Sequence, residues 1–341
     1  MRLPIPALIA PLVIAATIGL LPSVWSTSAN EYFARAKPAQ PPIEFLGAWG
    51  AKGAGPGLLA DPRTITTDAF GEVYITDAGA SASFIHKFTR EGRPLLSFEP
   101  LAAIHNPCAS AVDLGGAIYS LECGPNALYV FKPEGDLIHT IRGGLAAPAQ
   151  PSSVTVDNEG RIYVADSHAK RILRYTPRGG ALGAWGGKGT SSSGQKGAPE
   201  NPNVHADQIV ASLDGSLFIC DSTSGWFARI SPAGLIQREW TLPSSGASAS
   251  AGSHTSSGTI SAQRFYLAVT KTSVIAITGP TSVPVLHVFS YDGQEMLSKP
   301  LQDLNLSLAN IHLAGMAAMQ DGEVFILDSA SPSVFRLRVN M

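Results

Sequence analysis

The sequence predicts an all-β protein, a six-bladed β-propeller whose blades are four-stranded antiparallel sheets. A pattern of a turn glycine, a short β-run and an acid recurs along the 341 residues. Other strand-like runs flank each copy, and a strand that suits the end of a blade stands before the first copy. Gly (34) and Pro (25) are abundant while only 15% of residues are charged, which fits many short strands joined by turns.

Residues 1–29 have the pattern of a targeting segment. Arg2 precedes an almost wholly apolar, uncharged run from Ile5 to Val24, and a polar stretch follows. We interpret the segment as a cleaved signal peptide, with an uncleaved membrane anchor through residues 5–24 as the alternative. Residues 30–42, with three prolines, form the predicted linker to a propeller at 43–341. The sequence therefore predicts an extracytoplasmic protein, periplasmic or secreted.

The recurring pattern occurs five times in full and once in degenerate form. The full copies occupy residues 71–77, 116–122, 160–166, 215–221 and 322–328, and residues 272–278 fill the remaining gap without the glycine or the acid. The last positions of successive copies are 44 to 57 residues apart, which fits four short strands and their loops. Each copy therefore predicts the second strand of one blade.

The two ends of this region predict how the ring closes. The last copy stops after its third strand, residues 334–339, whereas residues 43–49 form a fourth-strand motif with no strands before it. In that motif Gly47-Ala-Trp-Gly50 recurs as Gly183-Ala-Trp-Gly186, at the end of an internal fourth strand. Pairing 43–49 with 334–339 in one blade closes the ring and removes its exposed edges.

Two of the copies resemble the NHL repeat. Copy one has Trp49-Gly-Ala-Lys-Gly-Ala-Gly-Pro-Gly57, then Pro62 and the run from Gly71 to Asp77. Copy three has Pro151, Asp157, Gly160, Ile162-Tyr-Val-Ala-Asp166 and Arg171-Ile172. The repeats lack the Trp-Asp dipeptide of WD40 blades and the kelch pattern of a double glycine directly after the second strand. The resemblance extends over about residues 43–339 and implies an NHL-repeat β-propeller. Because some similar propellers are metal-dependent enzymes, it leaves catalysis open.

The repeated acids, at residues 77, 122, 166, 221 and 328, occur once per blade at equivalent positions. One active site does not need five copies, so we interpret them as structural acceptors for the loop that follows each of them. The eight histidines show no metal-ligand spacing such as His-Glu-x-x-His, and there is no nucleophile elbow. From these patterns we predict no catalytic residue, no metal and no cofactor.

Propellers carry function where the first strand of each blade begins, around one mouth of the central tunnel. Carrying the register from copy to copy places these polar residues there: Asp61, Arg63, Asn106, Gln150, His205, Asp207, Arg264 and His312. A concave polar mouth is a candidate ligand site, although a merely hydrated mouth has the same composition. Blades four and five adjoin, so Asp207 could pair with Arg264. Arg63 would then lack a partner and suit an anion.

Two functions fit these observations. The first is an extracytoplasmic binding or scaffolding propeller that holds a protein, peptide or glycan ligand, with an anionic group at Arg63. The second is a metal-dependent hydrolase or lyase with Asp61, His205 and His312 as ligands, although Arg63 and Arg264 nearby would repel a cation. The net charge of −2, with Lys and Arg scattered, excludes a nucleic-acid footprint. We expect a monomer that meets a membrane only through an uncleaved N-terminal segment.

Cys108 and Cys123 are candidates for a disulfide, which an exported protein would form. If Gly115 and Gly116 make a two-residue hairpin turn, the cysteines face each other at a spacing near the lower limit for a disulfide. If the loop is one residue longer, their side chains point to opposite faces. Cys220 lies within a predicted strand and suits a buried apolar position.

Overall fold

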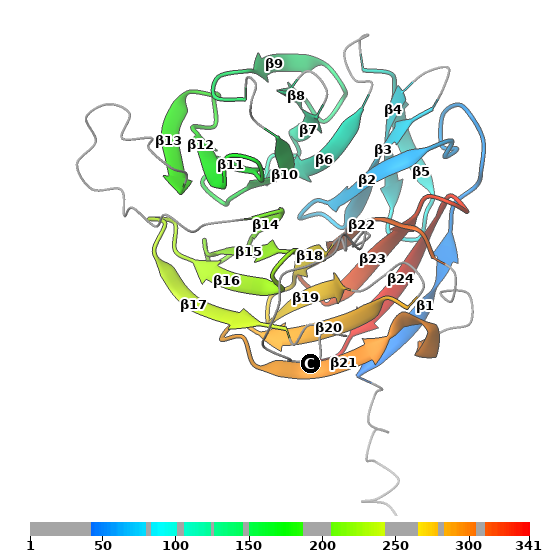
Figure 1. Cartoon of the computed structure of the whole chain (residues 1–341). Helices are drawn as coiled ribbons and strands as arrows, with labels where there is room; N and C mark the ends of the chain where they lie inside the picture. Colours follow the sequence, from blue (N-terminus) through cyan, green and yellow to red (C-terminus); the bar gives the residue numbers. More distant parts are fainter. Residues whose placement is uncertain are drawn as a thin grey trace, which may run out of the picture. The chain divides into compact units, whose positions relative to one another are not determined.

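The computed structural model describes residues 42–79, 83–100, 106–123, 126–145, 150–186, 206–242, 265–278, 283–304 and 311–341. In these residues 24 strands form six four-stranded antiparallel sheets around a central axis (Figure 1). The predicted six-bladed β-propeller is confirmed. The predicted signal segment and most of the linker, residues 1–41, lie outside the described residues. Within the described part, no helix is long and apolar enough to cross a membrane.

Each blade is a meander whose first strand lines the central tunnel. Blades one to three comprise β2 (Pro62–Thr67), β3 (Glu72–Ala78), β4 (Ser83–Thr89) and β5 (Pro94–Phe98); β6 (Pro107–Val112), β7 (Ile118–Glu122), β8 (Ala127–Phe131) and β9 (Leu137–Ile141); and β10 (Pro151–Val156), β11 (Ile162–Asp166), β12 (Arg171–Tyr175) and β13 (Ala181–Gly186). Blades four and five comprise β14 (Gln208–Ala211), β15 (Leu217–Asp221), β16 (Trp226–Ile230) and β17 (Ile236–Thr241); and β18 (Tyr266–Val269), β19 (Ser273–Thr278), β20 (Val285–Ser290) and β21 (Glu295–Pro300).

Blade six closes the ring as predicted. It comprises β22 (Leu313–Ala318), β23 (Glu323–Asp328), β24 (Ser333–Val339) and, as its fourth strand, β1 (Ile43–Trp49). β1 pairs antiparallel with β24, from Ile43 opposite Val339 to Trp49 opposite Val334, with one register shift at a bulge. Figure 1 shows β1 in blue beside β24 in red. The short 3-10 helix η1 (Leu301–Asp303) lies between blades five and six.

The hairpin between first and second strands is fixed by an acid and ended by a glycine. Asp68 Oδ1 accepts the N–H groups of Phe70 and Glu72, both at 2.9 Å, and the hydroxyl of Tyr74 donates to Oδ2 at 3.0 Å. Gly71 ends the turn at φ 88°, a conformation that costs glycine nothing. The same arrangement recurs with Asp113 and Tyr119 and with Asp157 and Tyr163.

Large side chains of one blade cover a turn glycine of the next. A Cβ atom on Gly92, between β4 and β5, would lie 2.3 Å from the ring of Trp49 in blade six, so no larger residue fits there. The equivalent pairs are Phe98 on Gly135, Ile141 on Gly179, Trp185 on Gly234 and Trp240 on Gly293. These contacts lock neighbouring blades together around most of the ring.

The second strands lie in the core of the molecule. Every residue of β7, β11 and β15 is buried, because the neighbouring blades cover both faces of each strand. Between blades six and one, for example, Phe325 packs in one cluster with Ile75 and Phe88. Burial on both faces explains why these strands are continuous apolar runs that end in an acid rather than alternating sequences.

Candidate functional site at the tunnel mouth

The first strands of all six blades enclose a central tunnel of about 980 Å³. It extends from the start of these strands, at Arg63 and Asp207, to the turns that follow them, at Asp68 and Leu213. We call the end where the first strands begin the mouth. The opposite side, which carries the first–second and third–fourth strand turns, is the turn face. These polar residues line the mouth: Arg63, Asn106, Gln150, Ser152, Ser167, Asp207, Ser222 and Thr223.

The repeated acids hold the mouth in place. Four of them accept the backbone N–H group just before the first strand of their own blade: Asp77 that of Asp61, Glu122 that of Asn106, Asp166 that of Gln150 and Asp328 that of His312. The fifth, Asp221, accepts the N–H of Thr223 in the following loop. The predicted bond to the following loop also occurs for Asp166, through Ala169. The bond to the mouth was not predicted.

Blade one adds a buried histidine to this anchor. His86 is fully buried, with Nε2 3.7 Å from Asp77 Oδ2 and Nδ1 2.8 Å from Ser97 Oγ. Burial alone would raise the pKa of Asp77, but the adjacent imidazole of His86 and hydrogen bonds from the amides of Ala60 and Asp61 lower that pKa below its ordinary value. Asp77 therefore stays ionised at neutral pH. The stability it contributes is lost as the pH falls through its lowered pKa.

Arg63 is not the unpaired cation that the sequence suggested. Its Nη2 lies 2.5 Å from Asp61 Oδ2, and the two side chains are 46% and 42% exposed. Asp61 lies in the bend just before β2, and Arg63 lies at the register shift between Pro62 and Thr64, so this pair depends on local backbone geometry that regular strand alternation does not give. An ion pair this exposed contributes little stability. A ligand carboxylate can therefore compete with Asp61 for the guanidinium.

Asp207 lies at the mouth, where the sequence placed it, but Ser222 is its partner. Ser222 donates its N–H, at 2.9 Å, and its hydroxyl to Asp207 Oδ2. The partner suggested by the sequence, Arg264, lies outside the described residues, and so does His205. Of the predicted pairing between Asp207 and Arg264, only the position of Asp207 is therefore described.

The register inferred for blade five was wrong by one residue. Leu267 pairs with Ala276, as Ile65 pairs with Ile75 in blade one, which puts Phe265 rather than Arg264 at the position of Arg63. The cause is the first hairpin of blade five. Its Thr270 N–H bonds to Ser273 O across a two-residue turn, whereas blade one bonds Asp68 to Glu72 across three. A fixed count of residues back from the turn therefore selected Arg264, which is one residue before the position equivalent to Arg63.

The three residues considered as metal ligands do not form a described cluster. Asp61 is paired with Arg63, and His205 lies outside the described residues. His312 is exposed, and its backbone N–H rather than its imidazole binds Asp328, at 3.0 Å. Nowhere in the described ranges do three His, Cys, Asp or Glu side chains converge on a point that could hold a metal ion.

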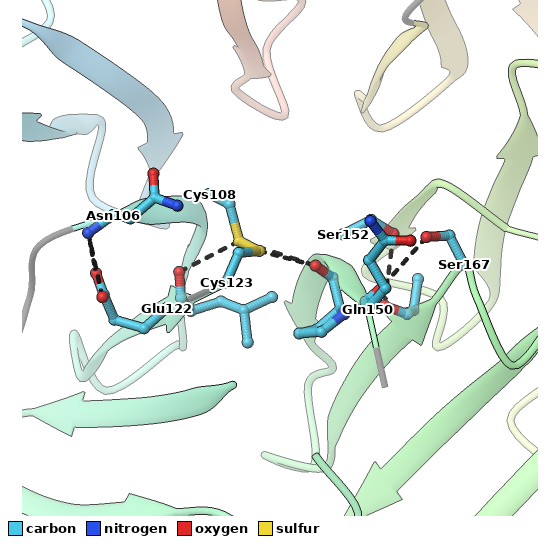
Figure 2. The surroundings of a disulfide bond; sticks show 10 residues. Asn106, Cys108, Glu122, Cys123, Gln150, Ser152 and Ser167 are labelled. Carbon is cyan, nitrogen blue, oxygen red and sulfur yellow. Dashed lines mark hydrogen bonds between the residues drawn. A yellow bond between two sulfur atoms is a disulfide. The ribbon is translucent and has the colours of Figure 1, made fainter. Parts of the chain in front are cut away.

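Asn106 and Gln150 present two carboxamides at the mouth, from blades two and three. Both residues are exposed, and neither side chain has a hydrogen-bond partner among the described residues. Figure 2 shows them on either side of the Cys108–Cys123 disulfide. Ser167 supports Gln150, since its N–H and its hydroxyl both donate to Gln150 O at 3.1 Å. The sequence analysis missed Ser167, although a serine follows the acid in three copies, at residues 167, 222 and 329.

Cys108 and Cys123 form a disulfide, with Cα atoms 5.9 Å apart (Figure 2). The hairpin is the longer of the two considered, because Asp113 N–H bonds to Ala117 O across three residues. In a regular ladder the two side chains would then point apart. A bulge at Cys108, between the pairs Pro107–Glu122 and Ala109–Leu121, turns its side chain toward Cys123. The free Cys220 is buried.

We expect the disulfide to stabilise the propeller measurably. The bond closes a separation of 15 residues, for which loss of the crosslink costs about 3 kcal/mol of unfolding free energy. The Cys108→Ser/Cys123→Ser variant should lose about that much in urea denaturation. Cys220→Ser, which removes a thiol but no crosslink, controls for the substitution. Two freely alkylated cysteines in the 108 and 123 peptides of the unreduced protein would contradict the bond.

Comparison with known proteins agrees with this architecture. Residues 149–175 match the model of the NHL repeat. A streptogramin B lyase structure is 16% identical, with a TM-score of 0.54, over 87% of this chain and 98% of that chain. An inactive virginiamycin B lyase from Staphylococcus aureus, with quinupristin, is 14% identical, with a TM-score of 0.54, over 82% of this chain and 95% of that chain. At such identities the likeness concerns the fold alone. No curated protein matches the chain.

The fold and the site define a six-bladed propeller with a polar tunnel mouth, whose rim is held by backbone anchors and which presents the exposed carboxamides of Asn106 and Gln150. The residues of copy three that carry the resemblance, Pro151 to Ile172, lie within the matched range 149–175. The chain is therefore a six-bladed β-propeller with an NHL repeat at residues 149–175.

Proposed function

We propose that this protein is an extracytoplasmic binding propeller that holds an extended peptide segment at the tunnel mouth. The proposal rests on the pair of exposed carboxamides, Asn106 and Gln150. Their backbone N–H groups are bound by the acids of their own blades, while their side chains have no hydrogen-bond partner among the described residues. A carboxamide offers a carbonyl acceptor and an NH₂ donor. It therefore complements the N–H and C=O groups of a peptide unit.

The surrounding groups suit the same ligand. Ser152, Ser167 and Thr223 add hydroxyls along the mouth on blades three and four, and Asp207 adds a carboxylate. Arg63 remains the contact for an acidic side chain or a terminal carboxylate, but the ligand must displace Asp61 from it. Neutral hydrogen bonds, rather than the unpaired cation suggested by the sequence, should therefore supply most of the affinity.

The disulfide supports a location outside the cytoplasm. Disulfides persist in oxidising compartments and are rare where thiols are kept reduced. The apolar run at residues 5–24 independently predicts export. Both observations favour a periplasmic or secreted binding protein, with membrane anchoring by residues 5–24 as the alternative.

We expect removal of the two carboxamides to weaken peptide binding about tenfold. Two neutral hydrogen bonds of about 0.5–1 kcal/mol each correspond to a factor of that size. Peptides enriched from a random phage library on the wild-type protein would be titrated against Asn106→Ala/Gln150→Ala by calorimetry. Arg63→Ala should reduce affinity only for peptides with an acidic group.

The matched control removes an exposed carboxamide elsewhere. Gln237 lies on the outer strand β17, so Gln237→Ala should bind like the wild type. Equal peptide affinities of the double variant and the Gln237→Ala control would contradict the proposed site. Enrichment of glycans on an array, with no peptide enriched by the library, would redirect the proposal to a carbohydrate ligand.

A further inference from the structure

Exposed apolar side chains gather on one side of the propeller. Phe70, Leu114 and Leu213 stand at the tips of first–second strand turns in blades one, two and four, and Phe70 is 74% exposed. Others stand just after third–fourth strand turns, on the outer rim of the same face: Leu95, Leu137, Ile138, Leu235 and Met296. Among the described residues only two exposed large apolar side chains, Leu58 and Val283, lie in loops on the opposite side.

The chain enters the propeller at this same face. β1 begins at Ile43, opposite Val339, and Asn340 N–H bonds to Pro42 O at 2.9 Å. Val339 N–H in turn bonds to Gly322 O, in the first–second strand turn of blade six, at 2.9 Å. The covalent connection to residues 1–41, which contain the uncharged apolar run Ile5–Val24, is therefore made at the turn face.

We propose that the turn face contacts a lipid bilayer and that the mouth points away from it. The apolar tips stand on separate turns around the ring with polar residues between them. A fluid interface can admit each tip separately, whereas a folded partner usually needs one continuous complementary patch. If residues 5–24 are kept as the membrane anchor, the alternative given above, the membrane lies on the side where the chain enters the propeller.

The charges of the turn face fit a zwitterionic surface. They are largely paired with one another: Arg90 with Asp321 at 2.9 Å, Lys132 with Asp136 at 3.2 Å and Arg229 with Asp214 at 2.8 Å. No strong field of one sign remains to select an anionic membrane or a highly charged protein. Contact then depends on the apolar tips. Membrane contact through the turn face leaves the proposed peptide site at the mouth open to solution.

Site-specific fluorescence on the full chain tests this orientation. Phe70→Cys and Leu213→Cys place an environment-sensitive dye on the turn face, while Arg63→Cys and Leu58→Cys place it on the mouth side, with Leu58 as the matched apolar control. The disulfide-bonded and buried native cysteines do not compete for the dye. With phosphatidylcholine vesicles, the dye at 70 and 213 should shift to the blue and be quenched by nitroxide lipids, and the dye at 63 and 58 should not.

Other patterns overturn the proposal. Quenching at 63 but not at 70 would reverse the orientation. Without vesicles, the dye at 70 could become protected from a soluble quencher as the protein concentration rises. That result would show that this face is an interface between copies of the chain. No quenching at any position would exclude membrane contact. None of these results affects peptide binding at the mouth, so the two proposals fail separately.

Discussion

Deletion of residues 43–50 should abolish cooperative folding of the propeller. β1 forms the outer ladder of blade six against β24, and its Trp49 lies against Phe88 of blade one, with ring centroids 4.9 Å apart. The Trp49 Nε1 also donates to Arg90 O at 3.1 Å. The strand therefore both completes blade six and fastens it to blade one. Deleting it leaves the edge of β24 open to aggregation.

The expected size of this effect is comparable to the whole stability of the domain. Ladder hydrogen bonds along the six residue pairs of β1 and β24, at about 1 kcal/mol each, and the loss of a large aromatic contact at about 3 kcal/mol together approach the 5–15 kcal/mol typical of a folded protein. Differential scanning calorimetry should show no cooperative transition near that of the wild type.

The control is a deletion of equal length upstream. Removing residues 31–38 shortens the predicted linker but keeps β1, so its melting temperature should match that of the intact chain. A synthetic peptide of residues 42–50 should partly restore the transition of the 43–50 deletion, because it can occupy the vacant edge. An unchanged melting temperature for the 43–50 deletion would contradict closure by β1.

The second large effect should come from Asp166→Ala. The carboxylate is fully buried and accepts the N–H of Gln150 at 2.9 Å, the N–H of Ala169 at 3.2 Å and the Arg171 Nε at 2.9 Å. Removing one partner of a buried, hydrogen-bonded charge costs about 3–5 kcal/mol. The amide groups and the guanidinium, which is 19% exposed, lose their acceptor.

Two further variants separate burial from charge. Asp166→Asn keeps one acceptor oxygen for the amides, so its loss in urea denaturation should fall between the wild type and the alanine variant. Asp136→Ala removes an acid that is 72% exposed and should cost less than about 1 kcal/mol. A loss for Asp166→Ala no larger than that of Asp136→Ala would show that the anchor contributes no stability.

Most of the fold could be predicted because it repeats. The run from a glycine to an acid marks a strand covered on both faces, and six occurrences determine the number of blades. Closure followed from two incomplete ends, residues 43–49 and 334–339, that complete each other. The register of blade five could not be predicted, because copy five has lost both marks and its hairpin is one residue shorter. A count along the sequence does not detect a missing turn residue.

The site could be predicted by position but not by pairing. Register alone placed Asn106, Gln150 and Asp207 at the mouth, where the structure has them. It did not show that Asp61 neutralises Arg63, because partner choice depends on side-chain direction at the start of a strand. The bulge at Cys108 was equally hidden, since bulges leave no fixed residue pattern. With a three-residue hairpin and no bulge, the alternation of side chains along a strand would have pointed the two cysteines apart.

The backbone anchors of the mouth separate the scaffold from its specificity. Asp77, Glu122, Asp166 and Asp328 bind main-chain N–H groups at positions 61, 106, 150 and 312, and these groups are present whatever side chain stands there, proline excepted. Side chains at those four positions can therefore be exchanged while the rim keeps its shape. Selection, natural or in the laboratory, could therefore change the chemistry of this rim through a handful of substitutions, each of which keeps the protein folded.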